Sequence, residues 1–404
     1  MAEPLPATPR RIAWLHFAND FTLDFLTPFL PTGVPAAWVG VMEGVADAIG
    51  QALKLVTGRA SDASGRRVRW VAAGYGLNAL ARPLAGVGLF LGWPFWIIAC
   101  RVADRVGKGL RGSASDALVA DWTQGEMRAR AYAANRFMDH VGATCGGLAA
   151  LALAWFAPHL IAYGVIGLAL PALLVLLLCR GLADHPDAAP KSGPPPGWWP
   201  REPALRLPLA LLALASLARL GPLLVLVRVG LVPDADAGDA IAAHAAGQAA
   251  GAWQPWKLAL FWCALSAVQA VAAAGAGWAT ARLGARRFLV VGYVVGALVL
   301  AGLAGLHGAA LVAAGLGYGA LAGLTEGAEK TWLAELAPKH ERATAFGALA
   351  ILMALAALAG NAGVGFAFDA GWAAPALFTL CGVQALAALG LLARRWHGPA
   401  PTAG

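Results

Sequence analysis

The middle of residues 94–121 carries six charged side chains, in a stretch that otherwise has the length and apolar character of a membrane-spanning helix. Steps of three, four and seven residues return to one face of a helix, so the six charges fall on the same side. Facing lipid at about 2.5–3.5 kcal/mol each, they would cost about 15–20 kcal/mol. We therefore predict that this face lies against a protein interior, a watery cavity or opposite charges. The six residues are Arg101, Asp104, Arg105, Lys108, Arg111 and Asp116.

Carboxylates elsewhere in the first half are placed to meet these charges. Asp20 and Asp24 keep helical spacing, as do Glu43 and Asp47. The pKa of a carboxylate depends on burial and on nearby cations. A conformational change that alters both can therefore bind a proton on one side of a membrane and release it on the other. We predict these four as the proton-coupling residues. The alternative is structural, with the same charges paired to lock neighbouring helices together.

A charged cavity is the second prediction from these residues. Acids and bases balance in the first half, whereas the second half carries far fewer of either at membrane depth. The cavity should therefore be polar on its first-half wall and more apolar on the other. The residues predicted to line it are Arg101, Asp104, Arg105, Lys108, Arg111, Arg136, Asp139, Glu326, Glu329 and Lys330.

The composition is that of an integral membrane protein. Of 404 residues, 59% are hydrophobic and 13% are charged, against about 25% charged in soluble domains. Five cysteines stand singly in apolar segments, which predicts free thiols rather than disulfides or metal ligands. We predict no cofactor, no metal and no enzymatic activity, because the sequence has no phosphate-loop motif or metal-ligand spacing and no recognisable nucleophile–base constellation.

Apolar windows of membrane-spanning length number six on each side of a proline-rich break. The predicted fold class is an all-α integral membrane protein with 12 transmembrane helices in two six-helix bundles. The predicted domains are residues 1–180, a cytoplasmic linker over 181–206, and residues 207–404. The windows lie near 12–33, 36–57, 69–91, 94–120, 130–155, 158–180, 207–230, 255–278, 287–306, 308–334, 344–366 and 373–393.

The distribution of Lys and Arg predicts the orientation. With the N-terminus in the cytoplasm, the loops on the opposite side, the longest at 231–254, contain neither residue. Both termini are then cytoplasmic, and the net charge of +8 reflects topology rather than nucleic-acid binding. Arg10 and Arg11 precede an apolar run that Asn19 and Asp20 interrupt, so we predict a retained first helix rather than a cleaved signal peptide.

The two halves repeat each other in sequence. Asp116-ALVA-Asp121 with Arg128 corresponds to Lys330-TWLA-Glu335 with Arg342 at a constant offset of 214. GRASDASGRR at 58–67 corresponds to GWATARLGARR at 277–287 at an offset of 219. Two parallel six-helix repeats are the arrangement expected of one class of transporters.

At these positions the chain resembles the major facilitator superfamily of secondary transporters. The most specific match is Gly58-x-x-x-Asp62-x-x-Gly65-Arg66-Arg67, and Arg105-x-x-x-Gly109 is a second. The resemblance implies that the first motif is a latch holding the cytoplasmic side closed, with Asp121 and Arg128 as a gating or structural ion pair. In the second copy Ala281 replaces the acid, so that latch should be weaker.

A third match lies near residue 145. Gly142, Gly146 and Gly147 resemble the glycines of the family's antiporter signature, but Ala143 stands where a proline is usual. The resemblance also implies that the first helix lines the cavity, which makes Asp20 and Asp24 the first candidates for proton coupling.

We therefore predict a secondary transporter in the bacterial inner membrane, working by alternating access and similar to bacterial drug and metabolite exporters. Proton-coupled export of a small polar or amphipathic molecule is the leading hypothesis, with a siderophore, another metabolite or a drug as cargo. The alternatives are an importer or uniporter on the same fold, and a receptor or scaffold that no longer transports. The expected partners are the substrate, protons and the lipid bilayer, without nucleic acid, and the expected state is a monomer.

Overall fold

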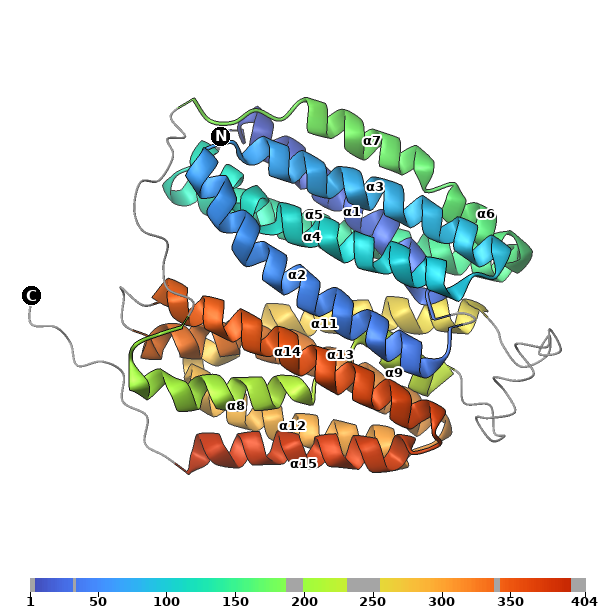
Figure 1. Cartoon of the computed structure of the whole chain (residues 1–404), viewed down its shortest axis with the longest axis vertical. Helices are drawn as coiled ribbons and strands as arrows, with labels where there is room; N and C mark the ends of the chain where they lie inside the picture. Colours follow the sequence, from blue (N-terminus) through green and yellow to red (C-terminus); the bar gives the residue numbers. More distant parts are fainter. Residues whose placement is uncertain (1–3, 32–33, 187–198, 231–254, 338–341, 394–404) are drawn as a thin grey trace, which may run out of the picture. The chain divides into compact units, whose positions relative to one another are not determined.

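The computed structural model describes residues 4–31, 34–186, 199–230, 255–337 and 342–393, and all regular structure in these ranges is helical (Figure 1). Three short 3-10 turns, Thr27–Phe29, Pro158–Leu160 and Pro203–Leu205, join longer helices. The helices of the first half are α1 (Ala7–Leu26), α2 (Ala36–Ser64), α3 (Arg67–Leu91), α4 (Pro94–Trp122), α5 (Gly125–Phe156), α6 (Ile161–Ile166) and α7 (Ala169–Arg180). Those of the second half are α8 (Arg206–Leu217), α9 (Pro222–Gly230), α11 (Pro255–Leu283), α12 (Ala285–Gly305), α13 (Gly308–Leu336), α14 (Arg342–Asp369) and α15 (Ala373–Leu392).

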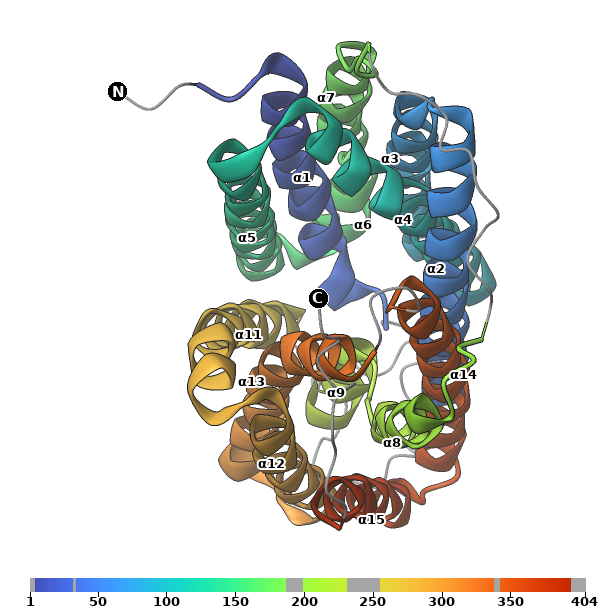
Figure 2. The same cartoon turned by 90° about the vertical axis from the view of Figure 1, so that its left-hand side faces the viewer.

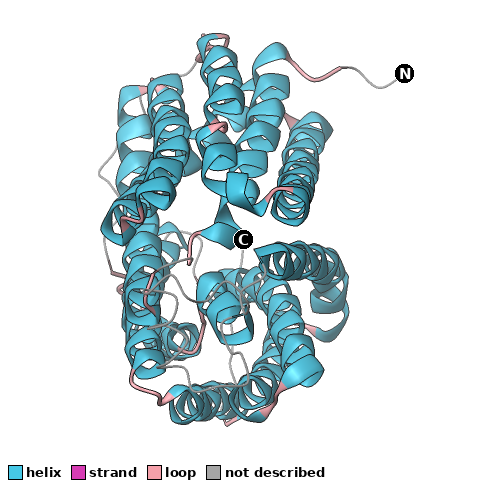
Figure 3. Cartoon of the chain, turned by 90° about the vertical axis from the view of Figure 1, so that its right-hand side faces the viewer, coloured by secondary structure: helices cyan, strands magenta, loops and turns pink. Residues whose placement is uncertain are grey.

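Two of the spans are interrupted helices. α6 and α7 lie in one apolar span, Pro158–Arg180, and α8 and α9 lie in another, Pro203–Val229. Counted in this way, the described residues hold twelve spans, and the predicted twelve-helix membrane fold is confirmed. The helices are linked by loops and turns (Figure 3).

The first four helices differ from the others in polarity. Within the described residues, eight spans are long and apolar enough to cross a membrane by length and composition alone, and all eight lie from α5 onward. Helices α1, α2 and α4 carry charged residues singled out in the sequence, and α3 carries the buried Asn78 and Arg82. Their charges must therefore be satisfied by protein groups rather than by lipid.

The chain divides into two compact units. The first comprises Met1–Val34, Val45–Pro195 and Gln254–Cys263, and the second comprises Pro35–Gly44, Pro196–Trp253 and Ala264–Gly404. The first turns of α2 thus belong to the second unit, and the first turns of α11 belong to the first. The domain boundaries predicted from the sequence stay a prediction, and residues 187–198 of the predicted linker lie outside the described residues.

Glycines set the closest helix contacts of the first unit, where α1 packs beside α5 and α3 beside α4 (Figure 2). A Cβ atom on Gly142 or Gly146 of α5 would overlap the carbonyl oxygens of Phe17 and Phe21 on α1. A Cβ atom on Gly107 of α4 would lie 2.7 Å from the carbonyl oxygen of Gly74 on α3. These helix backbones approach each other more closely than any side chain would allow.

The second unit has a larger apolar core. Here α12 packs against α15 and α13, and α8 packs against α14. Leu212 of α8, Tyr293 of α12 and Trp332 of α13 are fully buried in one cluster. This core places polar side chains of α12 and α13 beside the interruption between α8 and α9.

The sequence repeat is also a structural repeat. Helices α4 and α13 begin at 94 and 308 and end at 122 and 336, so the offset of 214 holds at both ends. Helices α2 and α11 begin at 36 and 255 and end at 64 and 283, which gives the offset of 219. Gly65 and Gly284 follow α2 and α11 with φ of 64° and 79°, a left-handed conformation that glycine adopts without strain.

Two aspartates cap helices that lie far away in the sequence. Oδ1 of Asp184 accepts hydrogen bonds from the backbone nitrogens of Arg67 and Val68, at 2.8 and 2.9 Å, where α3 begins. The carboxylate of Asp369 accepts 2.9 Å hydrogen bonds from the first two backbone nitrogens of α2. Each aspartate satisfies helix N–H groups that would otherwise have no partner in the helix.

Candidate functional site

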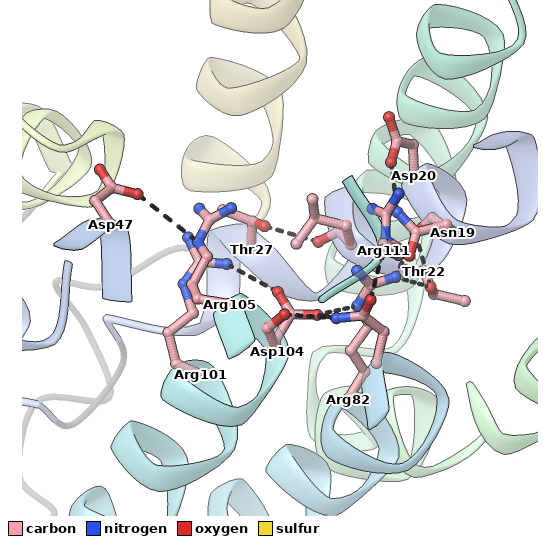
Figure 4. A network of polar contacts seen from close by, with 12 residues as sticks. Asn19, Asp20, Thr22, Thr27, Asp47, Arg82, Arg101, Asp104, Arg105 and Arg111 are labelled. Atoms are coloured by element: carbon pink, nitrogen blue, oxygen red, sulfur yellow. Dashed lines mark hydrogen bonds and ion pairs between the residues drawn. The ribbon is translucent and has the colours of Figure 1, made fainter. Parts of the chain in front are cut away.

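Asp104 of α4 is the centre of a buried polar network in the first unit (Figure 4). Its Oδ1 accepts hydrogen bonds from Nε of Arg82 at 2.8 Å and from Nδ2 of Asn78 at 2.7 Å. Nη1 of Arg101 lies 3.9 Å from Oδ2. Asp104, Arg82 and Arg101 are each 3% exposed, so this carboxylate has its charge neutralised inside the protein.

Arg82 also ties α3 to α1. Its Nη1 donates 2.5 Å hydrogen bonds to the carbonyl oxygen of Asn19 and to Oγ1 of Thr22. The Asn19 carbonyl lies one residue before Asp20, so the network reaches the predicted proton-coupling helix. The pair formed by Arg82 and Asp104 thus joins three helices, which favours the structural alternative for these two residues.

Arg111 lies one step further along α4 and is also buried. Its guanidinium carbon lies 4.5 Å from the centre of the Tyr75 ring, and its Nε donates to Oδ1 of Asn78 at 3.3 Å. The Asp20 carboxylate points toward the Arg111 guanidinium (Figure 4). The side chain of Asn19 donates a 2.7 Å hydrogen bond to Oδ1 of Asp20. Asp20 is therefore placed beside a cation.

Asp24 has different surroundings. It lies one helical turn after Asp20 on α1 and is 7% exposed. Its Oδ1 accepts a 2.8 Å hydrogen bond from the indole nitrogen of Trp262, a neutral donor at the start of α11. Among the described residues, Asp24 forms no ion pair. Its direct hydrogen-bond partner among the described residues is thus an uncharged group from another helix.

His16 and Asp139 form a second polar link between α1 and α5. Nδ1 of His16 lies 2.6 Å from Oδ1 of Asp139, and both side chains are largely buried. His16 precedes Asp20 by one helical turn, so both lie on one side of α1. The sequence predicted Asp139 as a cavity residue but did not predict its partner.

Helix α2 contributes less to this cluster than its spacing predicts. Asp47 is half-exposed, and its Oδ1 lies 4.0 Å from Nε of Arg105. Glu43 is buried but belongs to the second unit. Lys108 is exposed, unlike the other cationic residues of α4 around it. The predicted single charged face of α4 is therefore divided: Arg101, Asp104 and Arg111 are buried, Arg105 is partly buried, and Lys108 and Asp116 are exposed.

The predicted gating motif surrounds the turn from α2 to α3. Gly65 supplies the left-handed turn, and Arg66 after it is exposed. Nε of Arg67 donates a 2.5 Å hydrogen bond to Oδ2 of Asp121 at the end of α4. Gly58 lies close to Ser113 of α4. The motif arginine thus connects two helix ends in the first unit.

Four predicted residues have side chains that lie outside the described residues. No contact is assigned to them, and their predicted roles stay predictions. They are Asp62, Arg128, Arg136 and Glu326.

The glycines of the antiporter-like motif are packing positions. Gly142 and Gly146 allow α5 to approach α1, as described above, and a Cβ on Gly147 would lie 2.8 Å from Sγ of Cys263. Close packing explains why glycine stands at these three positions, and their role as an antiporter-like motif stays a prediction.

The second unit contains a buried ion pair that the sequence predicted only in part. Nη2 of Arg219, in the interruption between α8 and α9, donates a 2.7 Å hydrogen bond to Oε1 of Glu329 on α13. The hydroxyl of Tyr293 on α12 donates to the same oxygen at 3.0 Å. Glu329 is 2% exposed, whereas its neighbour Lys330 is exposed. Only Glu329 and Lys330 of this group were predicted as cavity residues.

The sequence does contain a feature that could have identified Arg219 as a site residue. The dipeptide Gly221-Pro222 interrupts an apolar window, and interrupted helices in transporters surround binding sites. Tyr293 and Trp262 gave no such signal, because an aromatic residue in an apolar helix usually packs in a core or faces lipid. Among the described residues, no three His, Cys, Asp or Glu side chains gather as a metal site would require.

Comparison with known proteins decides the family. Residues 12–235, more than half of the chain, match the family model of the Major Facilitator Superfamily. The chain belongs to the major facilitator superfamily. It is a multi-pass membrane transporter and not an enzyme, and the similarity seen in its motifs is confirmed.

Relatives of this superfamily member include two proteins of unassigned activity. An uncharacterized protein of Mycobacterium tuberculosis is 28% identical over 374 residues, which cover 87% of this chain and 82% of the relative. An uncharacterized MFS-type transporter of Methanocaldococcus jannaschii is 25% identical over 145 residues, 35% of each chain.

Solved transporter structures share the fold. The nucleoside transporter NupG superposes with a TM-score of 0.72 at 11% identity, covering 96% of this chain and 99% of that one. A bacterial homolog of the human lysosomal transporter Spinster, in an inward-facing conformation, gives 0.65 at 17% identity, covering 98% and 100%. At these identities the likeness shows the major facilitator fold and leaves the cargo open.

Proposed function

We propose that this major facilitator protein is a proton-coupled secondary transporter that works by alternating access and exports a small polar or amphipathic molecule. A siderophore, another metabolite or a drug is the candidate cargo. The charged first-unit network favours an anionic or zwitterionic molecule over a purely lipophilic one, because a lipophilic molecule would leave those groups without partners.

The surroundings of Asp24 carry the proposal of proton coupling. A carboxylate at membrane depth costs several kcal/mol when it is charged and lacks a cation. Asp24 is buried and accepts its hydrogen bond from a neutral indole, so a proton is the simplest neutralising partner. Asp104 contrasts with it, because two arginines already neutralise that carboxylate. We assign the transported proton to Asp24, with Asp20 beside Arg111 as the adjoining acid.

We further propose that the protein lies in the bacterial inner membrane with both termini in the cytoplasm, as a monomer. The absence of Lys and Arg from the predicted outer loops supports the orientation. Reporter fusions that are active only in the cytoplasm or only outside it, placed at the C-terminus and in residues 231–254, test this orientation. Activity of a cytoplasmic reporter at both positions would contradict it.

Import is the second candidate, and one observation favours it. The buried pair of Arg219 and Glu329 can bind an anion and a proton in the same state. A transporter that binds the two together carries both across the membrane in the same direction. Uptake of labelled cargo by intact cells, abolished by an uncoupler, would support import. Extrusion from preloaded cells, also abolished by an uncoupler, would support export.

The experiment for the proposed function uses purified protein in liposomes. Metabolites that accumulate in a deletion strain supply the cargo, and transport is followed with and without an imposed pH gradient. We expect the gradient to drive cargo against its concentration difference. Equal rates and no accumulation in both conditions would contradict proton coupling and would leave a uniporter.

A further inference from the structure

The interruption between α8 and α9 forms a small polar site in the second unit. Residues 218–221 are not helical, and side chains of other helices satisfy two of their backbone groups. The hydroxyl of Tyr318 donates to the carbonyl oxygen of Leu220 at 3.1 Å, and the nitrogen of Gly221 donates to Oδ1 of Asn361 at 2.5 Å. The interruption is therefore held in place by side chains of α13 and α14, which fixes the backbone that carries Arg219.

Arg219 has hydrogen-bonding capacity left over. Its side chain is 30% exposed, and its one side-chain hydrogen bond among the described residues goes to Glu329. A guanidinium has five N–H donors in a planar fork that matches a carboxylate. Most of these donors are thus available to a second acceptor on the exposed side.

A cavity of about 20 Å³ adjoins Arg219, with Tyr318, Thr325 and Gln384 also in its lining. This is room for one water-sized group, such as an oxygen of a carboxylate. Gln384 is 6% exposed, and its Oε1 has no hydrogen-bond partner among the described residues. An amide has both donors and acceptors, and by rotating it can present its NH₂ to an anion.

We propose that Arg219 and Gln384 bind the carboxylate of a ligand and that Glu329 occupies Arg219 in its absence. This names the chemical class of the cargo and rests on the proposed transport function. Ligand and Glu329 compete for the single positive charge of that guanidinium, because two neighbouring carboxylates cannot both stay ionised beside one cation. The buried Glu329 is then left without a counter-charge of its own, and it takes up a proton from solution.

The surroundings of Glu329 make a proton the available counter-charge. Among the described residues, the titratable or charged groups that face it are Arg219 from the interruption, Tyr293 from α12 and Tyr318 from its own helix. The side chain of Glu326, one helical turn earlier, lies outside the described residues. Lys330 is the next residue along α13 but is exposed, so its side chain leaves the buried side of the helix. The charged side chain that the structure describes on α14 is Asp369, at the far end of that helix. One proton per bound carboxylate is therefore expected.

The test measures binding of benzoate to the purified full chain by calorimetry in two buffers of different ionisation enthalpy. We expect benzoate to bind with uptake of about one proton, more weakly as the pH rises, and its neutral amide, benzamide, not to bind. Arg219→Gln should weaken binding at least about tenfold, the loss expected for a buried charge-assisted pair. Arg206→Gln, an exposed arginine on the same span, should leave it unchanged.

Glu329→Gln gives the diagnostic result. It removes the competitor, so benzoate should bind severalfold more tightly, without proton uptake or pH dependence. If this variant does not fold, Gln384→Leu replaces it, with a severalfold loss of affinity and unchanged proton uptake. The proposal is overturned if benzamide binds as well as benzoate, if Arg219→Gln binds like the wild type, or if Glu329→Gln retains proton uptake. Asp24→Asn should leave benzoate binding intact, so failure of coupling at Asp24 is distinguishable from failure of this site.

Discussion

The indole nitrogen of Trp262 donates a 2.8 Å hydrogen bond to Oδ1 of Asp24, which is the direct polar partner of that buried carboxylate. The two residues are 238 positions apart, on α11 and α1. A neutral donor stabilises the charged carboxylate less than an arginine does, so the proton at Asp24 stays exchangeable. This contact distinguishes Asp24 from Asp104, which two arginines hold.

Trp262→Phe should move the pH profile of transport to higher pH. The hydrogen bond favours the charged form of Asp24, so its loss makes the proton harder to release. The measurement is the initial rate of cargo transport across a pH series. Trp256→Phe is the matched control, because Trp256 packs edge-to-face against Trp155 instead. An unshifted pH profile for Trp262→Phe would show that this contact has no role in the coupling step.

Asp104→Asn should destabilise the protein by about 3–5 kcal/mol, because Arg82 would be left buried without its carboxylate. The midpoint of thermal unfolding in detergent is the measurement. Asp116→Asn, on an exposed part of the same helix, should change stability by less than about 0.5 kcal/mol. A combined Arg82→Met and Asp104→Leu variant should recover part of the loss. Equal stability of the two single variants would contradict a structural role for the pair.

Gly146→Ala should destabilise the first unit by about 1–3 kcal/mol or more. Its Cβ would overlap the carbonyl oxygen of Phe21 and force α1 away from α5. Gly363→Ala is the control, since nothing lies within 4 Å of a Cβ there and alanine favours a helix. Yield of monodisperse protein and its unfolding midpoint report the difference. Tolerance of Gly146→Ala would mean that α1 and α5 do not pack so closely.

Asp184→Ala should cost about 0.5–2 kcal/mol, the usual value of a helix cap, because two backbone nitrogens at the start of α3 lose their acceptor. Asp184→Asn retains one acceptor oxygen and should cost less. Unfolding midpoints of the two variants give the comparison. An alanine variant as stable as the asparagine variant would show that solvent satisfies these nitrogens equally well.

The sequence predicted the parts of this fold that depend on local patterns. The apolar windows and the repeat offset of 214 can be read from the sequence, and both have their counterpart in the helix bounds. The family motifs around Asp62 and Arg105 indicated the superfamily, and the family match confirms it.

The pairing of side chains was beyond the reach of the sequence. Spacing placed Asp20 and Asp24 on one helix face, yet only packing puts a cation beside one and an indole beside the other. Asp121 was expected to pair locally with Arg128, whereas its described partner is Arg67, 54 residues away. Such partners depend on which helices become neighbours. Periodicity within one helix does not contain that information.

Proton flux with and without the Asp24 carboxylate is the most direct test of coupling. Wild-type and Asp24→Asn protein are reconstituted in liposomes that enclose a pH-sensitive dye, and labelled cargo from the deletion-strain screen is added. In the wild type, cargo movement should change the internal pH. Asp24→Asn should move labelled cargo across the membrane with a smaller change of internal pH, limited to any proton that accompanies the cargo at Glu329. Equal proton flux in the two proteins would contradict the assignment of the proton to Asp24.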